Sequence, residues 1–403
     1  MSKVFIIDGK RSPIGSFLGV LRNVHPSDLG AEVLKGMLEQ NKNVPIEKID
    51  EVITGNILPA GLGQGLSRQI SIKAGLPVEV PAYSINMVCG SGMKSVMNAY
   101  ANIRLGLHNL VIAGGVESMS NAPYLVSSKI RDGVKFGEMK LVDHMINDAL
   151  TDIFNGCHMG ITAENIVAKH NIDRASQDEL SIKSQQKAIS AVDEGRFKDE
   201  IIPIVVRGRK TDVIVDQDEY PNRTTNLEKL SNLRAAFKKD GVVTAGNSSG
   251  INDGASYVLL ASEESIKQYK LQPKAEIIGI GQGGVDPSVM GLGPVPAIRN
   301  ALKMAGLQLK DIDLLELNEA FAAQALGVVK ELSEEHKISV DEILDKTNLN
   351  GGAIALGHPV GASGNRIIVT LLHEMKKRNA KYGLASLCIG GGMGTAVILE
   401  LAK

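Results

Sequence analysis

The chain of 403 residues is 43% hydrophobic and 22% charged, and its formal net charge is −1. This length exceeds one ordinary hydrophobic core and predicts a globular protein of two or three domains. The near-neutral charge argues against nucleic acid or a membrane surface as a partner, and no apolar run approaches the roughly 20 residues that a spanning helix needs. Because the N-terminus reads directly into a strand without a signal-peptide pattern, we expect a cytoplasmic location.

The N-terminal part of the sequence alternates between apolar runs and amphipathic stretches. The apolar runs predict strands at 3–8, 51–57, 82–88 and 110–113. Apolar residues at helical spacing predict helices that begin with Ser27 as a cap, at 64–74, and after Gly92. This alternation of strands and helices is typical of an α/β fold with a mostly parallel sheet.

The middle of the chain, 121–250, is richer in charge and less regularly periodic than either end. We interpret this stretch as an insertion that folds over the core, and a third independent domain is the alternative.

The C-terminal part repeats the N-terminal part. The run at Lys274 resembles the run at Lys3 at an offset of 271 residues, and Ala362-Ser-Gly resembles Gly90-Ser-Gly at an offset of 272. Helices are again predicted, at 295–305, 319–332 and 365–377. We therefore predict two copies of one unit, with 1–120 plus 251–270 as the first half and 271–403 as the second.

Three cysteines occur in the chain, too few and too oddly spaced for a disulfide framework or a zinc site. Cys157 is typical of a small buried apolar side chain. Cys89 and Cys388 differ because each follows an apolar strand and stands beside glycines, which leave room for a substrate to approach closely. No metal-ligand cluster is indicated.

Cys89 also directly precedes a predicted helix. The free N–H groups and the partial positive charge at a helix N-terminus favour a thiolate, so we expect a lowered pKa for this thiol. His358, in a glycine-rich loop at the corresponding place of the second copy, is the natural base for its proton. If the two copies pack about a pseudo-twofold axis, these two loops meet.

A second thiol suits chemistry at a carbon next to a carbonyl. Cys388 could move a proton to or from such a carbon, while Cys89 carries an acyl group as a thioester. Asn318, at the end of a predicted strand, could orient a water molecule or could simply form a turn. His158 could contact a ligand or could be a surface residue.

These motifs resemble the thiolase family nearly from end to end. The segments that carry the resemblance are 86–94, 114–120, 158–164, 244–254, 318–322, 357–364 and 388–394. The resemblance implies a duplicated five-layer α/β/α/β/α sandwich, in which 121–250 is an inserted loop domain that binds coenzyme A. It also implies a homotetramer.

The resemblance further implies acetyl transfer between coenzyme A thioesters, in which two acetyl-CoA condense reversibly to acetoacetyl-CoA and CoA. Cys89 would take the acetyl group with His358 as its base, and Cys388 would handle the α-proton. The N–H groups of Cys89 and Gly390 would form one oxyanion hole, and His358 with a water on Asn318 the other. No cofactor is expected, because the thioesters are themselves the substrates.

By the same resemblance, a group of side chains would line the coenzyme A channel: His158, Met159, Leu150, Ala245, Ser249 and Met290. Ala320 and Phe321 would border the acyl pocket. Arg223 would contact the adenine, although it stands one position away from where the family pattern places such an arginine.

Three other functions compete with this prediction. A 3-ketoacyl-CoA thiolase of β-oxidation would act on longer chains. A β-ketoacyl synthase would share the fold and the nucleophilic cysteine, but the second thiol at Cys388 argues against it. A non-catalytic acyl or lipid carrier on the same scaffold would have inert thiols.

Overall fold

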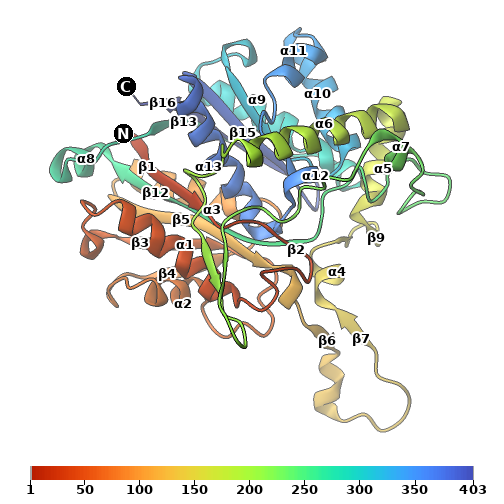
Figure 1. Cartoon of the computed structure of the whole chain (residues 1–403), viewed down its shortest axis with the longest axis horizontal. Coiled ribbons are helices and arrows are strands. Elements are labelled where there is room, and N and C mark those ends of the chain that lie inside the picture. Colours follow the sequence, from red (N-terminus) through yellow and green to blue (C-terminus); the bar gives the residue numbers. More distant parts are fainter. Residues whose placement is uncertain (1, 403) are drawn as a thin grey trace.

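The computed structural model describes residues 2–402, and the two halves of the chain form similar units within it (Figure 1). The N-terminal half comprises β1 (Val4–Arg11), α1 (Pro26–Gln40), β3 (Glu51–Gly55), α2 (Leu66–Lys73), β4 (Ala82–Ile85), α3 (Ser91–Arg104), β5 (Leu110–Ser118) and β12 (Asn252–Ser262). The C-terminal half comprises β13 (Ala275–Gly284), α9 (Pro294–Ala305), β14 (Leu314–Leu317), α10 (Ala322–His336), α13 (Val360–Arg378), β15 (Tyr382–Ile389) and β16 (Met393–Leu401).

Strand order confirms the predicted duplication. The first half runs β4-β3-β5-β12-β1, and the second runs β14-β15-β16-β13, with a single parallel bridge from Leu315 to Thr347 where β4 would be. The two half-sheets join at β1 and β13. Both of these strands carry an irregularity in register, between Ile6 and Asp8 in β1 and between Ile277 and Gly279 in β13. The two irregularities are 271 residues apart, which is the offset found in the sequence.

The expectation of a mostly parallel sheet is wrong. Within each half only the strands towards the outer edge of the sheet are parallel, namely β3 with β4 and β5, and β14 with β15. The other strands, β12 and β1 in the first half and β16 and β13 in the second, run antiparallel to their neighbours. A parallel strand needs a crossover connection, whereas β15 returns to β16 through a short glycine turn after Ile389.

Two helices occupy the centre of the molecule. The faces of α3 and α13 pack on each other and on both half-sheets, while α1 and α2 cover one outer face and α9 and α10 the other. This is the predicted layered sandwich. A Cβ on Gly92 would lie 2.8 Å from the Gly361 carbonyl oxygen, and one on Gly364 would lie 2.6 Å from the Met93 nitrogen. The repeated Ser-Gly pair is therefore the place where the two central helices touch through their backbones.

Some predicted element ends are also wrong. The helix predicted to begin with Ser27 as its cap begins at Pro26, with the His25 ring accepting the Ser27 N–H. Pro is favoured at a first helical position, so the helix starts one residue before the predicted cap.

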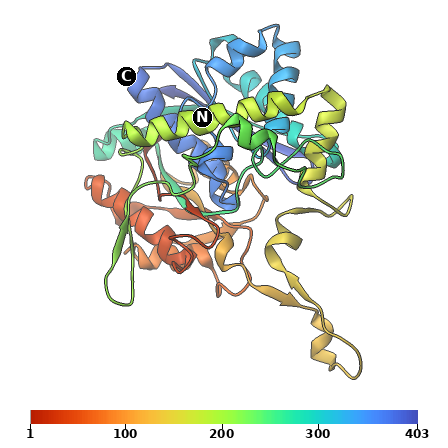
Figure 2. The same cartoon turned by 45° about the vertical axis from the view of Figure 1, so that its right-hand side comes forward.

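The insertion leaves the core after β5 and returns at β12. Its hairpin of β6 (Tyr124–Val126) and β7 (Leu141–Asp143) projects away from the body in both views (Figures 1 and 2). The other elements of this segment are η2 (Met119–Asn121), η3 (Ser128–Asp132), α4 (His144–Asp148), β8 (Thr151–Asp152), β9 (Cys157–His158), α5 (Met159–His170), α6 (Arg174–Asp193), β10 (Ile204–Val206), β11 (Val213–Val215) and α7 (Leu227–Ser231).

The remaining elements are short connections: β2 (Gly15–Ser16), η1 (Ile46–Lys48), α8 (Glu263–Tyr269), η4 (Pro287–Leu292), η5 (Leu309–Asp311), α11 (Val340–Asp345) and α12 (Ala353–Leu356). Within residues 2–402, no helix combines the length and the apolar character needed to cross a membrane.

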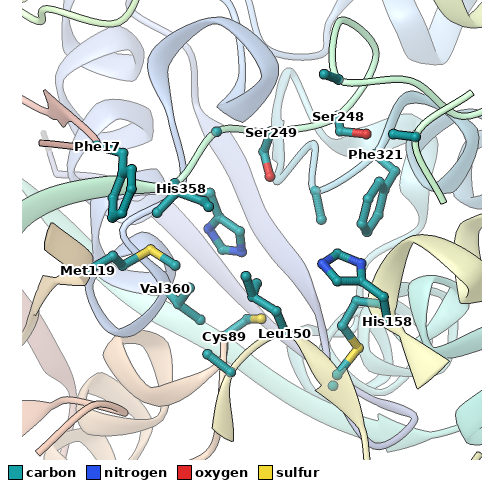
Figure 3. Close-up of a pocket in the computed structure, with 18 of the residues that line it drawn as sticks. Phe17, Cys89, Met119, Leu150, His158, Ser248, Ser249, Phe321, His358 and Val360 are labelled. Atoms are coloured by element: carbon teal, nitrogen blue, oxygen red, sulfur yellow. The ribbon is translucent and has the colours of Figure 1, made fainter. Parts of the chain in front are cut away.

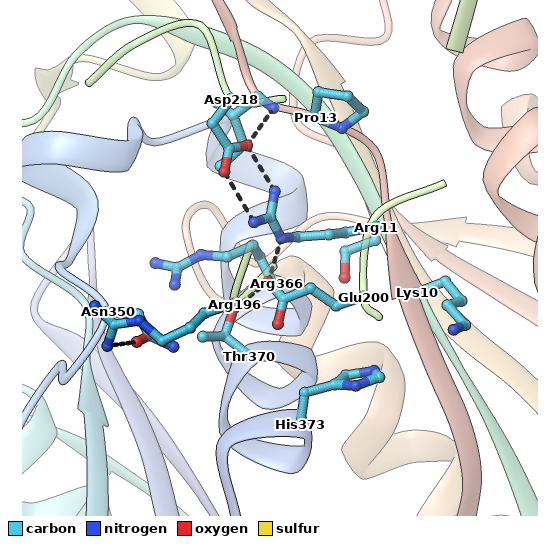
Figure 4. Close-up of polar contacts among 12 residues, drawn as sticks. Lys10, Arg11, Pro13, Arg196, Glu200, Asp218, Asn350, Arg366, Thr370 and His373 are labelled. Atoms are coloured by element: carbon cyan, nitrogen blue, oxygen red, sulfur yellow. Dashed lines mark hydrogen bonds and ion pairs between the residues drawn. The ribbon is translucent and has the colours of Figure 1, made fainter. Parts of the chain in front are cut away.

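A buried ionic network fastens the insertion to the core (Figure 4). Arg11 of β1 is fully buried, and its guanidinium donates to Glu200 at 2.6 Å and to both carboxylate oxygens of Asp218 at 2.7 and 2.9 Å. Thr370 of α13 donates to the same Glu200 at 3.1 Å. Because both acidic residues belong to the insertion, removal of Arg11 would leave two buried charges without their main partner.

Candidate active site

Cys89 lies in a strained turn between β4 and α3. The strand predicted at 82–88 ends at Ile85, and Val88 takes a φ of +46°. A β-branched residue in this region stores strain on the order of 1–3 kcal/mol, which must be offset by its surroundings. Ser91 offsets it by accepting the Met87 N–H at 2.8 Å and donating to the Val88 carbonyl at 2.7 Å. The result is a sharp elbow that presents Cys89 two residues before the helix begins.

The expected lowering of the Cys89 pKa is wrong. Burial raises the pKa of this thiol to about 11, although backbone hydrogen bonds from Gly390 and from Cys89 itself act in the opposite direction. Desolvation penalises the thiolate more than the two N–H groups favour it. The thiol is therefore neutral near pH 7 and needs a base. The same two N–H groups are those that the resemblance assigns to an oxyanion hole.

His358 has the properties of that base. It stands two residues before α13, as Cys89 does before α3, and its backbone N–H donates to Asn252 at 2.9 Å. Burial lowers the pKa of the imidazole to about 4, so the ring is neutral near pH 7. Its Nδ1 lies 2.6 Å from the Ser363 hydroxyl, whereas its Nε2 is buried without a hydrogen-bond partner among residues 2–402.

Glu117 of β5 fixes the loop of His358 from the other half of the molecule. Its carboxylate accepts the N–H groups of Gly361 at 3.0 Å, Ile57 at 3.0 Å and Leu58 at 3.2 Å. A Cβ on Gly115, two residues earlier in β5, would lie 2.0 Å from the Gly361 carbonyl oxygen. The position of the His358 loop thus depends on close backbone contact with β5.

Cys388 lies near the end of β15 and is buried. Burial raises the pKa of its thiol, and the neighbouring Cys89 raises it further. The Cys89 sulfur therefore disfavours the charged form of Cys388. Gly391 and Gly392 follow at φ values of +84° and +83°, so the turn after Cys388 requires glycine.

The three reactive groups share one cavity of about 540 Å³ (Figure 3). Twelve of the fourteen site residues predicted from the sequence line it: Cys89, Leu150, His158, Met159, Ala245, Ser249, Met290, Ala320, Phe321, His358, Cys388 and Gly390. Cys89 and His358 are 269 positions apart in the chain and converge here because the two central helices touch at their first turns.

Asn318 is not among the lining residues. It is buried at the end of β14, and neither atom of its side-chain amide has a hydrogen-bond partner within residues 2–402. A buried amide without partners is costly unless a water molecule or ligand satisfies it. The free amide of Asn318 is therefore compatible with the predicted role of this residue in holding a water molecule.

Arg223 also lies outside the cavity. Its guanidinium pairs with Asp193 of α6 at 2.6 and 3.0 Å, and both side chains are more than half exposed. The structure therefore does not bring Arg223 together with the other predicted residues. The ion pair satisfies its charge at the surface.

An aromatic group that the sequence prediction missed borders one side of the cavity. Phe237 stacks on the His158 ring at 4.7 Å and meets Phe321 edge-on at 6.0 Å. Burial lowers the pKa of His158, so this ring is neutral near pH 7 and can stack as an apolar surface. The chain has only seven Phe, and Phe17, Phe237 and Phe321 all line the cavity. No local signal in the sequence distinguished Phe17 and Phe237 from the other four Phe that lie elsewhere.

Comparisons with known proteins agree with this fold. The family model described as Thiolase, N-terminal domain matches residues 4–264, and the one described as Thiolase, C-terminal domain matches residues 271–401. The chain therefore belongs to the thiolase family, as its motifs predicted.

Curated relatives match over nearly the whole chain. It is 52% identical to an acetyl-CoA acetyltransferase of Chromobacterium violaceum, with 99% of each chain covered. It is 48% identical to a probable acetyl-CoA acyltransferase of Staphylococcus aureus, with 100% of each covered.

Solved structures agree as well. The acetyl-CoA acetyltransferase of Syntrophomonas wolfei superimposes with a TM-score of 0.96 at 42% identity, covering 100% of both chains. Human mitochondrial 3-ketoacyl-CoA thiolase superimposes with a TM-score of 0.94 at 44% identity, covering 100% of this chain and 99% of that one.

Proposed function

We propose that this thiolase is an acetyl-CoA C-acetyltransferase that condenses two acetyl-CoA molecules reversibly to acetoacetyl-CoA and CoA. The observation that carries the proposal is the convergence of two neutral thiols and one neutral imidazole in a single apolar cavity. A carrier needs only an apolar cavity, whereas two thiols beside an unpartnered imidazole nitrogen supply a nucleophile, a base and a second proton donor.

The first half-reaction transfers the acetyl group to Cys89. The free Nε2 of His358 takes the thiol proton, and the sulfur attacks the thioester carbonyl, whose oxygen is stabilised by the N–H groups of Cys89 and Gly390. The bond between the carbonyl carbon and the coenzyme A sulfur breaks. The coenzyme A sulfur leaves with the proton of Cys388, so that His358 remains protonated and Cys388 becomes a thiolate.

The second half-reaction forms the carbon–carbon bond. The Cys388 thiolate removes an α-proton from a second acetyl-CoA, and its high pKa makes it a strong base. The enolate oxygen is stabilised by His358 and by a water molecule on Asn318, and its carbon attacks the acetyl group on Cys89. The Cys89 sulfur leaves and recovers its proton from His358, which restores the starting state.

Two variants test these roles. Cys89→Ser should not form an acyl-enzyme, whereas Cys388→Ser should accept one acetyl group and fail to form or cleave the carbon–carbon bond. Mass spectrometry after incubation with acetyl-CoA measures the first property, and an acetoacetyl-CoA assay measures the second. A Cys388→Ser protein that stays unacetylated would contradict the assigned roles, and wild-type thiols that react with iodoacetamide no faster than free cysteine would favour a non-catalytic carrier.

We further propose that the enzyme needs no cofactor, acts in the cytoplasm in lipid metabolism, and assembles as a homotetramer. The projecting hairpin supports assembly, because it exposes a set of large apolar side chains: Tyr124, Val126, Ile130, Val134, Phe136, Met139, Leu141 and Val142. Apolar surface of this extent is typical of an interface between subunits. Light scattering of the wild type and of a variant with Phe136→Ser and Leu141→Ser tests this, since the variant should be smaller.

A 3-ketoacyl-CoA thiolase for longer chains is the second candidate. It is supported by the similarity to the human mitochondrial enzyme, whose identity to this chain is about that of the Syntrophomonas enzyme. Thiolysis rates of acetoacetyl-CoA and of a ten-carbon 3-ketoacyl-CoA separate the two, and a clear preference for the longer substrate would favour this alternative.

A further inference from the structure

A buried cation lies behind the catalytic cavity. Arg366 belongs to α13, the helix that begins two residues after His358, and its side chain is buried. It lies beside Arg11 and Glu200 in the ionic network between the insertion and the core (Figure 4). Arg366 is not among the residues that line the cavity, and the reaction as described so far gives it no role.

The partner of Arg366 lies on the strand that leads to Asn318. Glu316 of β14 is buried, and its carboxylate lies 3.4 Å from one guanidinium nitrogen. The other terminal nitrogen, Nη2, has no hydrogen-bond partner within residues 2–402. Arg11, in contrast, donates to carboxylate oxygens at 2.6, 2.7 and 2.9 Å. Arg366 is therefore less completely paired than Arg11.

Glu316 cancels only part of the charge of Arg366. Burial raises the pKa of this carboxyl to about 8, and the charge of Arg366 offsets only part of that effect. Glu316 is therefore largely protonated near pH 7, whereas a guanidinium stays charged in proteins. Two other carboxylates near Arg366, those of Glu200 and Asp218, already accept hydrogen bonds from Arg11. A net positive charge therefore remains inside the protein, where charges interact more strongly than in water.

The imidazole of His358 is the reactive group that this charge reaches. Burial is the larger cause of its lowered pKa of about 4, and the charge of Arg366 is the second. Other titratable groups surround the His358 loop from the elements packed against it, and none of them contributes to this lowering: the thiols of Cys89 and Cys388, the ring of His158, and the carboxyl groups of Glu117 and Asp253.

We propose that the charge of Arg366 keeps His358 neutral as a base and, once the ring has taken the Cys89 proton, favours return of that proton. A cation disfavours the second cation that protonation of the imidazole creates. The same effect makes the imidazolium a stronger acid towards the Cys89 sulfur that leaves in the second half-reaction. The inference rests on the acyl-transfer function proposed above. Arg366 is a positioning residue, because it acts on the reaction only through His358.

The test removes the charge and follows the protonation of the ring. Histidine labelled with ¹³C allows NMR to record the titration of His358, and His358→Asn assigns its signal. Arg366→Met should raise the midpoint of this titration by about one pH unit, the scale of one nearby charge at an effective dielectric constant of about 20. The acidic limb of kcat/KM for acetyl-enzyme formation should rise with it. Arg366→Lys keeps the charge and should stay close to the wild type.

Two further variants separate the charge from the packing. Because Arg366→Met leaves Glu316 without its partner, the double variant Glu316→Gln/Arg366→Met removes both groups and should show the same upward shift. Lys10→Met removes another buried cation, which is drawn in Figure 4 on β1, and should leave the midpoint unchanged.

An unshifted midpoint in both Arg366→Met and the double variant would overturn the inference, as would an equal shift in Arg366→Lys or in Lys10→Met. The NMR titration needs no substrate, so these outcomes are independent of the proposed function. A wild-type protein that forms no acetyl-enzyme would refute that function instead, and the two failures are thereby distinguished.

Discussion

The imidazole of His358 is held in one tautomer by Ser363. The Ser363 hydroxyl donates its hydrogen to the Pro359 carbonyl at 2.9 Å, as a helical serine commonly does. It can therefore only accept at the 2.6 Å contact with His358, so Nδ1 carries the ring hydrogen. The lone pair of the neutral ring lies on Nε2, which has no hydrogen-bond partner among the residues that the structure describes and belongs to a ring that lines the cavity.

Ser363→Ala should slow the formation of the acetyl-enzyme on the order of 10²-fold, since a general base typically contributes 10²–10⁴-fold and only its orientation is lost here. Stopped-flow measurement of coenzyme A release checks this. Ser363→Thr should restore most of the rate because it keeps the hydroxyl. Ser71→Ala, a buried serine of α2 outside the cavity, is the matched control. An equal loss in Ser363→Ala and Ser363→Thr would argue against the hydrogen bond.

The pH dependence of acetyl-enzyme formation should show a broad plateau. The reactive form combines a neutral imidazole with a neutral thiol, and the pKa values of about 4 for His358 and about 11 for Cys89 place this form across the physiological range. The acidic limb of kcat/KM should therefore lie near pH 4. An acidic limb near 6.5, the ordinary value for histidine, would contradict the buried, neutral ring.

The lowered pKa of His358 also predicts that the stability of the fold depends on pH. The folded pKa of His358 lies below its unfolded value of 6.5, so the unfolded chain binds more protons between these pH values. Stability should fall as pH drops from about 6.5 towards 4. Urea unfolding of the wild type and of His358→Asn across this range measures the contribution, and the variant should lose less stability on acidification.

Gly115→Ala should abolish activity while the chain still folds. The added Cβ would lie 2.0 Å from the Gly361 carbonyl, so the start of α13 and the His358 loop must move away from β5. Displacements on the order of 1 Å can cost about 10²-fold in rate. Gly284→Ala in β13 is the matched control, because the atom nearest to its added Cβ, the Gly392 carbonyl oxygen, would be 3.6 Å away. Wild-type activity in Gly115→Ala would show that the contact can relax.

Arg11→Met should lower the free energy of unfolding by about 3–5 kcal/mol, because Glu200 and Asp218 would stay buried without their guanidinium partner. Chemical denaturation measures this change. Lys3→Met breaks the exposed pair with Glu276 and should change stability by about 0–1 kcal/mol. A small effect in Arg11→Met would mean that water reaches the two carboxylates.

The sequence predicted the duplication, the layers and most of the cavity lining because glycine patterns and apolar periodicity are local signals. It did not predict the antiparallel strands in the middle of the sheet, since the direction of β12 and β16 depends on where the chain returns to the sheet. The pKa of Cys89 was also wrong. The helix N-terminus was visible in the sequence, whereas the desolvation that outweighs it depends on Met119, Val360 and other residues far along the chain.

Two further features were not predicted from the sequence, namely the position of Phe237 and the backbone conformation of Val88. Phe237 lies in a charged stretch whose fold depends on packing against α5, and its stacking on His158 has no local signature. Val88 belongs to a run that reads as an extended strand, and only the tight turn before α3 forces its left-handed backbone. Asn318 and Arg223 were recognisable from sequence motifs. Whether each side chain lines the cavity depends on the fold, and neither does.

The nucleophile belongs to one half of the duplicated chain and its base to the other. A newly synthesised N-terminal half therefore presents Cys89 without the imidazole that removes its proton, and the C-terminal half presents His358 without a target. Attack on a thioester that is assisted by this base therefore requires both halves in contact, so the enzymatic reaction begins only once the whole chain has folded.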